Sequence, residues 1–400
     1  MSEPITEKTH IVSVLSSLDD IDRGDWDTCA QPEAPGSNPF VSYDFLHALE
    51  KSKSAIAETG WYPQHLVLQD DAGDVSGVAP CYLKSHSQGE YVFDYGWADA
   101  FERAGGRYYP KLQIAVPFTP VTGPRLLTKP GDAADENRMV LASAAAERAK
   151  NLGASSIHVT FTSEAEANAL AELGYLHRTD QQFHFENNGY ASFDDFLAEL
   201  ASRKRKQLRK ERAQALANDI TIEWVSGSDI TEAHLERFYL FYMDTGSRKW
   251  GTPYLTRRFF DEIAETMADK MVFIFAKRAG KIVAGALNIV GADTIFGRYW
   301  GCMEDHPFLH FEVCYYQAID YAIEHKLQYV EAGAQGGHKL LRGYLPVTTH
   351  SAHFIVNPSF RKAVADYLVH ERRQVAYENE RLAERAPFKK CDVPQSGDEE

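Results

Sequence analysis

The sequence predicts a mixed α/β protein made of two similar units in tandem, each a largely antiparallel sheet flanked by helices. Three observations support this fold class. The chain has 400 residues, which exceeds one typical domain and suits two or three. It is 44% hydrophobic and 25% charged, a balance that supplies apolar side chains for two cores. The same order of elements, namely helix, β-hairpin, third strand, long helix and strand, is expected twice.

The first unit is expected over residues 10–188, after a flexible lead at 1–9. Apolar residues at helical or alternating spacing, separated by clusters of Gly, Pro and Ser, place its elements. The expected helices lie at 21–29, 43–52, 137–152 and 164–173. The expected strands lie at 10–16, 64–69, 75–84, 90–96, 156–161 and 181–185, with an irregular stretch at 98–122.

The second unit is expected over residues 189–380 and opens with a basic helix. No low-complexity linker separates the units, so we expect them to pack tightly. The expected helices lie at 195–218, 235–244, 256–268, 311–326 and from about 358 onward. The expected strands lie at 220–225, 271–277, 282–290, 294–300, 329–332 and 350–356. A disordered tail is expected at 381–400.

Composition and charge exclude several classes of protein. The net charge of −15 argues against nucleic-acid binding by the molecule as a whole, so any RNA contact needs a local basic patch. The N-terminus lacks the apolar core of a signal peptide, and no stretch is apolar enough to span a membrane. We therefore expect a cytoplasmic protein.

The five cysteines have no paired spacing, which predicts free thiols in a reducing compartment and no metal site: Cys29, Cys81, Cys302, Cys314 and Cys391.

Several long motifs carry a resemblance to a known family. They lie at Phe93–Asp99, Tyr108–Leu112, Val116–Arg125, Arg248–Leu255 and Glu331–Lys339. These motifs resemble a bacterial FemAB-like family, described as peptidoglycan-biosynthesis or GNAT-type proteins, and the element order is similar to two GNAT folds in tandem. The resemblance extends from about residue 12 to 380. It implies tandem GNAT-like domains and an N-acyltransferase of FemAB type.

The resemblance leaves the acyl donor open between aminoacyl-tRNA and acyl-CoA, with no permanently bound cofactor. A GNAT protein usually holds the pyrophosphate of coenzyme A on a glycine-rich turn before a helix. The equivalent segment here, Gly301–Phe308, contains two acids and a proline but no Gly-x-Gly pattern. This departure favours aminoacyl-tRNA, the donor that FemAB relatives use.

The segment from Gly333 to Arg342 is the strongest candidate for substrate binding. Glycines let a backbone approach a ligand, and a following Lys or Arg can hold a phosphate or carboxylate. A tight turn with solvated charges explains the same residues without function. Two other loops could form walls of a substrate cleft: the basic and aromatic loop Arg248–Tyr254 and the proline-rich loop Val116–Arg125. Both can equally be explained as packing elements. The predicted substrate-binding residues are Arg125, Arg248, Lys249, Trp250, Tyr254, Gly336, Lys339 and Arg342.

The basic helix offers the local patch that RNA binding would require. Its nucleic-acid-binding candidates are Arg203, Lys206 and Arg209, within a run of cations that covers most of the helix surface. In this acidic chain they predict a contact with tRNA. The simpler interpretation is a solvated helix face.

An acyl transfer to an amine also needs a base and a stabilised oxyanion. The catalytic candidates are Asp94, Glu331 and His338, and each has a structural explanation as well. No Ser-His-Asp arrangement or nucleophile elbow is present, which predicts direct attack by the amine without a covalent intermediate.

Three functions remain in competition. The first is transfer of an aminoacyl or acyl group to an amine of a peptide or cell-wall precursor. The second is CoA-dependent acetylation of a small amine. The third is a non-catalytic protein that binds a ligand or acts as a scaffold. The oligomeric state is not determined by any feature of the sequence.

Overall fold

The computed structural model describes residues 10–31, 38–249, 252–333 and 336–389. Its strands are β1 Ile11–Leu15, β2 Trp61–Pro63, β3 His65–Gln69, β4 Val75–Ala79, β5 Cys81–Lys84, β6 Lys111–Ile114, β7 Leu127–Thr128, β8 Ser156–Thr162, β9 Leu176–Glu186, β10 Ile220–Ser226, β11 Met271–Arg278, β12 Lys281–Val290, β13 Thr294–Cys302, β14 Tyr329–Glu331 and β15 Leu345–Ile355. Its α-helices are α1 Arg23–Ala30, α2 Tyr43–Lys51, α3 Tyr95–Arg103, α4 Ala134–Asn151, α5 Glu164–Glu172, α6 Phe193–Glu199, α7 Ser202–Ala215, α8 Glu232–Lys249, α9 Arg257–Thr266, α10 Leu309–Phe311, α11 Gln317–Glu324 and α12 Pro358–Ala383.

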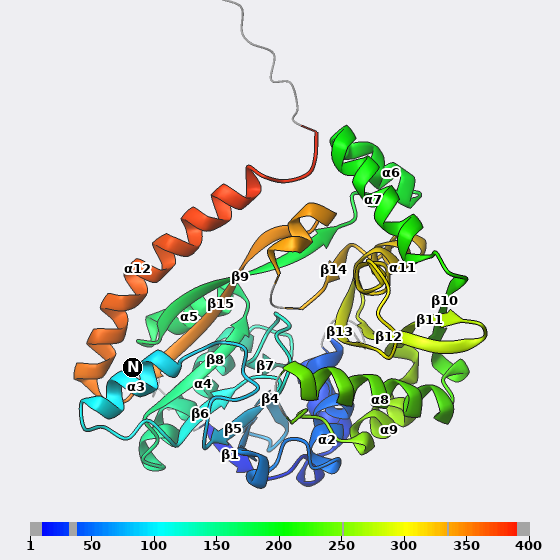
Figure 1. The fold of residues 1–400 in the computed structure, drawn as a ribbon. Coiled ribbons are helices and arrows are strands. Elements are labelled where there is room, and N and C mark those ends of the chain that lie inside the picture. Colours follow the sequence, from blue (N-terminus) through cyan, green and yellow to red (C-terminus); the bar gives the residue numbers. More distant parts are fainter. Residues whose placement is uncertain (1–9, 32–37, 250–251, 334–335, 390–400) are drawn as a thin grey trace, which may run out of the picture.

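Two sheets organise these elements (Figure 1). An 11-stranded sheet has the order β10-β11-β12-β13-β14-β9-β15-β8-β6-β5-β2, and a 4-stranded sheet has the order β1-β3-β4-β7. In the second unit β11, β12 and β13 are antiparallel, whereas β13 pairs in parallel with β14. The first unit repeats this pattern, because β5 and β6 are antiparallel and β6 pairs in parallel with β8. The predicted duplication of a mixed α/β unit is therefore confirmed.

The two units exchange their last strands. The second-unit strand β15 lies between β8 and β9, and the first-unit strand β9 lies between β14 and β15. Helix α12 then packs on β9 and β15, along one side of the molecule (Figure 1). Each unit thus completes its sheet with a strand from the other unit.

A shared core joins the units further. The first-unit helices α1 and α2 and the second-unit helices α8 and α9 contribute to one buried cluster. Phe40 meets Phe296 edge to face at 5.1 Å between ring centroids, and Phe45 meets Phe259 at 5.6 Å. Aromatic pairs at these separations are favourable beyond the area they bury. The expectation that the units pack tightly is confirmed, while the boundary at 188/189 stays a prediction.

Several predicted elements of the first unit were wrong. The residues expected as a third strand at 90–96 form a loop that leads into α3, which occupies part of the stretch expected to be irregular. Strand β6 takes the place of the third strand. The aromatic residues at 91–97 favour a strand, but buried contacts of Asp94 hold this position at the start of α3 instead. The strand expected at 75–84 is divided at Pro80 into β4 and β5, which belong to different sheets.

The elements of the second unit differ less from those expected. The helix expected at 195–218 is two helices, α6 and α7, because the intervening Leu200 pairs its backbone with Phe388. The disordered tail was wrong for 381–389: α12 continues to Ala383, and Lys389 donates its backbone N–H to the carbonyl of Glu199 at 2.9 Å. The remaining residues of that tail lie outside the described part of the chain.

A buried histidine pair fastens β15 to β8. His158 and His353 face each other across the two strands, with 2.6 Å between their Nδ1 atoms, and both side chains are buried. Burial lowers the pKa of His158 to about 3 and lowers the pKa of His353 as well. Both rings are therefore neutral at pH 7, and one must donate its proton to the other.

We expect this pair to make stability depend on pH. Both pKa values are lower in the folded protein than the usual value near 6.5. Above that pH both rings are neutral in the folded and the unfolded chain, so their titration does not lower the free energy of unfolding. Below it the unfolded chain takes up protons more readily, and stability falls by up to about 1.4 kcal/mol per pH unit for each ring.

The measurement compares the wild type with a double variant, His158→Gln with His353→Gln, by urea unfolding at pH 7.5 and pH 5.0. The difference cancels the carboxyl groups that titrate in both proteins. We expect the variant to be less stable at pH 7.5 and the deficit to shrink at pH 5.0. A deficit that is constant over this range would contradict the prediction.

Candidate active site

A cavity opens where β13 and β14 diverge. The two strands pair in parallel from Thr294 opposite Tyr329 to Phe296 opposite Glu331, after which β14 ends and β13 continues along β12. The cavity has a volume of about 510 Å³ and lies between the two units. It is lined by Ser87, Gly89, Tyr91, Phe93, Tyr95, Pro120, Tyr242, Thr245, Gly246, Thr252, Pro253, Tyr254, Arg298, Tyr299, Trp300, His310, Ala332 and Gly333.

The second unit supplies the rigid wall of this cavity. Arg298, Tyr299 and Trp300 follow one another on β13, and Ala332 and Gly333 come directly after β14. Helix α8 crosses β13 at Gly301, where an added Cβ atom would lie 2.3 Å from the carbonyl oxygen of Phe241. Only glycine permits this close approach. The strand ends and α8 are therefore held against each other at the cavity.

Arg298 is the cation that borders the cavity. Its Nη2 donates to the carbonyl oxygen of Phe118 at 2.8 Å, while its buried Nε has no hydrogen-bond partner among the described residues. The guanidinium carbon lies 5.4 Å from the ring centroid of Tyr299. A half-buried guanidinium on the cavity wall is suited to bind an anionic group of a ligand. Sequence reasoning missed Arg298, because a single arginine in an apolar strand matches no motif.

His310 borders the same cavity from α10. Its ring lies 5.2 Å from the ring of Trp300 and 5.4 Å from that of Tyr315. The chain after it forms a π-helix at Glu312–Tyr316, a rare irregularity that often accompanies functional sites. His310 was not among the catalytic residues predicted from the sequence. The structure adds it to the groups that a ligand in the cavity can reach.

Of the predicted substrate-binding residues, Tyr254 lies in the cavity. Its ring stacks on Phe118 with 4.8 Å between centroids. Arg248 is exposed on α8 and pairs with Asp244, and it does not border the cavity. The side chain of Lys249 and all of Trp250 lie outside the described residues.

The glycine, lysine and arginine segment forms a 3-10 helix, Gly337–Arg342, whose cations point inward. Lys339 is buried and donates to the carbonyl oxygen of Gly333 at 2.6 Å, which fixes one wall of the cavity. Burial lowers the pKa of Lys339 to about 8. Arg342 donates to Glu211 on α7 at 2.8 Å and lies 3.5 Å from the ring of Phe311. These two cations therefore contact protein groups behind the cavity wall and do not border the cavity. Gly336 does not border the cavity either.

Arg125 has a comparable supporting position. It is fully buried, and its guanidinium donates to backbone carbonyls of Val121, Gly123 and Thr160. Burial lowers its pKa to about 10. These contacts explain the shape of the proline-rich loop at 116–125, and they place the guanidinium away from the cavity.

The three predicted bases occupy different places. Asp94 is buried and accepts hydrogen bonds from Tyr108 at 2.6 Å and from Lys111. His338 is exposed and contacts the hydroxyl of Tyr315 at 2.9 Å. Glu331 lines a second cavity, next to Thr122, and burial raises its pKa to about 8. The structure does not bring the three together.

The segment Gly301–Phe308 is held by surface ion pairs. Glu304 accepts from Arg278 at 2.7 Å and contacts His306 at 2.9 Å. Hydrogen bonds from Arg278 and His306 lower the pKa of Glu304 to about 2. At the position of a coenzyme A pyrophosphate site, the two basic side chains Arg278 and His306 are thus already paired with a carboxylate and are not placed to hold a phosphate.

Most of the chain matches one known protein family. The model of the FemAB_like family, described as peptidoglycan biosynthesis/recognition, matches residues 17–390. The chain belongs to this family. No curated protein sequence matches it. No helix among the described residues is long and apolar enough to cross a bilayer.

Solved structures with low sequence identity share the fold. The crystal structure of FemX is 14% identical, with a TM-score of 0.52 over 86% of this chain and 98% of FemX. The C-terminal domain (DUF2156) of a protein named as a lysylphosphatidylglycerol synthetase, from Agrobacterium fabrum, is 11% identical, with a TM-score of 0.52 over 86% and 96%. A protein of unknown function from Bacteroides thetaiotaomicron is 12% identical, with a TM-score of 0.51 over 87% and 100%. The predicted tandem GNAT-like fold of the FemAB-like family is confirmed.

Proposed function

We propose that this FemAB-like protein is an N-acyltransferase that transfers an aminoacyl or acyl group to an amine of a peptide or cell-wall precursor. The observation that carries the proposal is the cavity at the divergence of β13 and β14, with Arg298 on its wall. Its volume of about 510 Å³ suits part of a large substrate rather than a whole one. Residues of both units line it, so both can contact the donor and the acceptor.

Three groups at the cavity supply the chemistry. Arg298 holds an anionic group of donor or acceptor and so aligns the reacting atoms. The main chain at Ala332 and Gly333 borders the cavity beyond the last paired residue of β14, where backbone N–H groups can stabilise an oxyanion. His310 accepts the proton that the attacking amine loses. The amine nitrogen forms a bond to the carbonyl carbon of the donor ester, and the bond from that carbon to the ester oxygen breaks. His310 then returns its proton to the leaving oxygen, which departs as the free hydroxyl of the donor.

We propose aminoacyl-tRNA as the donor. The carboxylate of Glu304 and the absence of a Gly-x-Gly pattern both disfavour a coenzyme A pyrophosphate at Gly301–Phe308. The test is a transfer assay with tRNA charged with labelled amino acids and an amine-bearing muropeptide, with acetyl-CoA in parallel reactions. We expect label in the peptide only from charged tRNA.

Each other outcome selects a rival function. Acetylation of the peptide, or thermal stabilisation by low micromolar acetyl-CoA, would replace the tRNA donor with the CoA-dependent alternative. If neither donor reacts or binds, the protein is a non-catalytic ligand-binding or scaffold protein. A His310→Gln variant separates catalysis from binding, because it should lower kcat about 100-fold and leave KM nearly unchanged.

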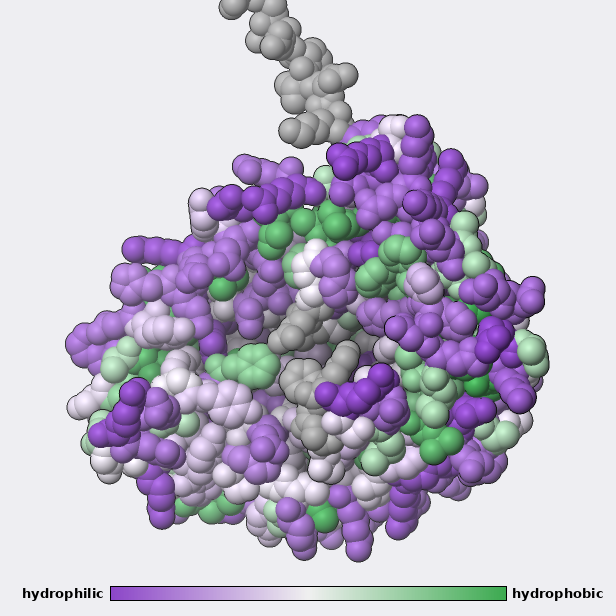
Figure 2. Space-filling model, in the orientation of Figure 1, coloured by the Kyte–Doolittle hydropathy of each residue, from purple (hydrophilic) through white to green (hydrophobic). Residues whose placement is uncertain are grey.

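Helix α7 presents a cationic face for the donor tRNA. Arg203, Lys206 and Arg209 are exposed, whereas Leu208 and Glu211 on the opposite face are buried. Figure 2 shows that the surface over α6 and α7 is strongly hydrophilic. Arg209 also pairs with Asp194 at 2.7 Å, so Arg203 and Lys206 are the freer cations of the three.

We expect neutralising these three cations to weaken tRNA binding without changing the fold. The triple variant Arg203→Gln, Lys206→Gln and Arg209→Gln should bind charged tRNA about tenfold more weakly near physiological salt. It should also lower the slope of log affinity against log salt by roughly one unit for each phosphate that the helix no longer neutralises. The matched control neutralises Lys362, Arg373 and Arg385 on and after α12, which are also exposed. Equal effects of the two triple variants would show that net charge alone acts.

A further inference from the structure

Two aromatic side chains of the first unit are exposed at the cavity that contains Arg298. Phe93 and Tyr95 both border this cavity and are 48% and 49% exposed. Their rings stack on each other at 6.2 Å between centroids and 24° between planes, and neither ring contacts a third ring among the described residues. We call this pair the aromatic platform. Exposed apolar side chains that gather at a cavity mark a surface on which a ligand packs.

The loop that carries the platform alternates between the cavity and the protein interior. Tyr91, Phe93 and Tyr95 border the cavity. The residues between them, Val92 and Asp94, are buried. One side of this short loop therefore presents three aromatic rings to the cavity, while the other side anchors the loop in the core.

Polar contacts hold the backbone under the platform in place. Asp94 accepts hydrogen bonds from Tyr108 at 2.6 Å and from Lys111 inside the core. Arg178 on β9 donates to the carbonyl oxygen of Phe93 at 2.9 Å. A surface that is ordered before its ligand arrives loses less conformational entropy when the ligand binds. The platform is therefore suited to binding although its rings are exposed.

Tyr91 connects the platform to Arg298. Its φ is 61°, a left-handed conformation that costs free energy in a bulky aromatic residue. Strained residues of this kind cluster at ligand-binding and active sites, and Tyr91 borders the cavity. Burial raises the pKa of Tyr91, nearby Tyr299 raises it further, and the charge of Arg298 opposes this rise, which places the phenol near the guanidinium. The platform and the cation thus belong to one continuous lining.

The charge of the cavity disfavours a cationic ligand group. Arg298 is the only lysine or arginine among the described residues that line it, and no aspartate or glutamate is among them. A bound ammonium group would find no carboxylate and would lie near a guanidinium of the same sign. The second unit adds the rings of Tyr254 and Trp300 to the lining. The walls therefore suit a ligand that is aromatic in one part and anionic in another.

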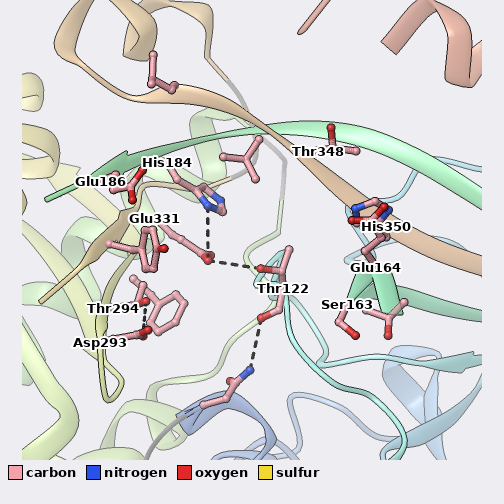
Figure 3. Close-up of a pocket in the computed structure, with 16 residues that line it drawn as sticks. Thr122, Ser163, Glu164, His184, Glu186, Asp293, Thr294, Glu331, Thr348 and His350 are labelled. Carbon is pink, nitrogen blue, oxygen red and sulfur yellow. Dashed lines mark hydrogen bonds and ion pairs between the residues drawn. The ribbon is translucent and has the colours of Figure 1, made fainter. Parts of the chain in front are cut away.

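The neighbouring cavity on the other side of Glu331 has a different lining. The residues labelled in Figure 3 are polar, and they include the carboxylates of Glu164 and Glu186. Of its described lining residues, only Phe296 and Tyr329 are phenylalanine, tyrosine or tryptophan. Residues of both units line this cavity as well. The aromatic character is therefore a property of the Arg298 cavity and not of the contact between the units in general.

We propose that the Arg298 cavity binds a substrate group in which an uncharged aromatic ring is joined to an anion, with the ring on the aromatic platform and the anion at Arg298. The ligand ring packs on Phe93 and Tyr95 in an offset or edge-to-face arrangement, as aromatic pairs prefer. The guanidinium holds a carboxylate or phosphate through paired N–H donors. This inference rests on the proposed function, because it names the class of substrate that the same cavity takes.

The test is calorimetric titration of the full-length protein at pH 7.5 with N-acetyl-L-phenylalanine, which carries a ring and a carboxylate. N-acetyl-L-alanine keeps the carboxylate without the ring, and N-acetyl-L-phenylalaninamide keeps the ring without the charge. We expect the first compound to bind with one site per chain, and each analogue to bind about tenfold more weakly because it loses one of the two contacts. Equal binding of either analogue would overturn the proposal. So would the absence of N-acetyl-L-phenylalanine binding at millimolar concentration.

Variants locate the ring and the anion. Phe93→Ala and Tyr95→Ala each remove an exposed ring, so the fold should be kept, and each should weaken binding of N-acetyl-L-phenylalanine about fivefold to tenfold. Arg298→Met should weaken it about tenfold or more. The control Tyr377→Ala removes a ring on α12 that is 58% exposed and lies outside the cavity, and it should change nothing. Binding that both platform variants leave unchanged would reject the platform.

The transfer assay shows which substrate carries the ring. Phe93→Ala should raise KM about fivefold for the donor or for the acceptor and leave kcat nearly unchanged, because the platform contacts a bound group and not the reacting bond. The substrate whose KM rises carries the ring. If transfer occurs and neither KM changes, this inference fails while the acyl transfer stands. If no transfer occurs, the proposed function fails, and the titration still decides whether the cavity binds a ring and an anion together.

Discussion

Replacing Arg298 by methionine is expected to reduce kcat/KM for acyl transfer by roughly tenfold to 150-fold. This range corresponds to about 1.5–3 kcal/mol, the usual contribution of a hydrogen bond to a charged group. Methionine preserves the apolar stem that packs beside Tyr299, so the variant removes mainly the charge and the donors. The measurement is the steady-state rate with charged tRNA and the amine-bearing peptide.

The kinetic pattern shows what Arg298 does. A rise in KM for one substrate with unchanged kcat assigns the guanidinium to that substrate's anionic group. Arg298→Lys should recover only part of the activity, because an ammonium cannot reproduce the planar fork of donors. The control Arg107→Met changes an exposed arginine that no cavity uses and should retain full activity. Full activity of Arg298→Met would remove Arg298 from the site.

Replacing Lys111 by methionine is expected to destabilise the fold by about 3–5 kcal/mol, because it leaves buried carboxylates without their cation. Lys111 has no exposed surface, and its Nζ donates to Glu90 at 2.7 Å and to Asp94. Burial raises the pKa of Asp94 and the Lys111 charge lowers it more, so the pKa lies below its usual range. Burial lowers the pKa of nearby Lys84 to about 6, so Lys84 cannot replace the missing charge at neutral pH.

The measurement is urea unfolding at pH 7.5. Adding Asp94→Asn to Lys111→Met should restore part of the stability, because it removes the stranded charge. The control Lys150→Met changes an exposed lysine whose partner is Glu147, and a surface pair of this kind is worth at most about 1 kcal/mol. Equal destabilisation by the two single variants would contradict a structural role for the buried network.

The sequence was most informative where a local pattern sufficed. The hairpin of β11 and β12 was predicted from alternating apolar residues around a turn at Ala279 and Gly280, both of which adopt positive φ. The prediction failed at 90–96 because the partners of Asp94 come from other segments. Tyr108 and Lys111 follow it by 14 and 17 residues, and only the folded chain places them around its carboxylate.

The candidate site shows more clearly that contacts between distant residues cannot be predicted from local sequence patterns. Lys339 and Arg342 were singled out as ligand-binding cations, but a sequence cannot show which way a charged side chain points. The partner of Arg342 is Glu211, 131 residues away, and that contact turns the guanidinium inward. Arg298 and His310 have no distinctive neighbours in the sequence. They became candidates only because the diverging strands place them on one cavity.

By itself, the sequence determined the duplicated α/β architecture, the motifs of the family and the basic helix, since each depends on residues near one another in the chain. Only the tertiary structure decided which charges face solvent or a cavity and which are buried in pairs. It also revealed that β9 and β15 are exchanged between the units. Strand pairing across more than 150 residues depends on the packing of both units together, and local residue preferences do not encode it.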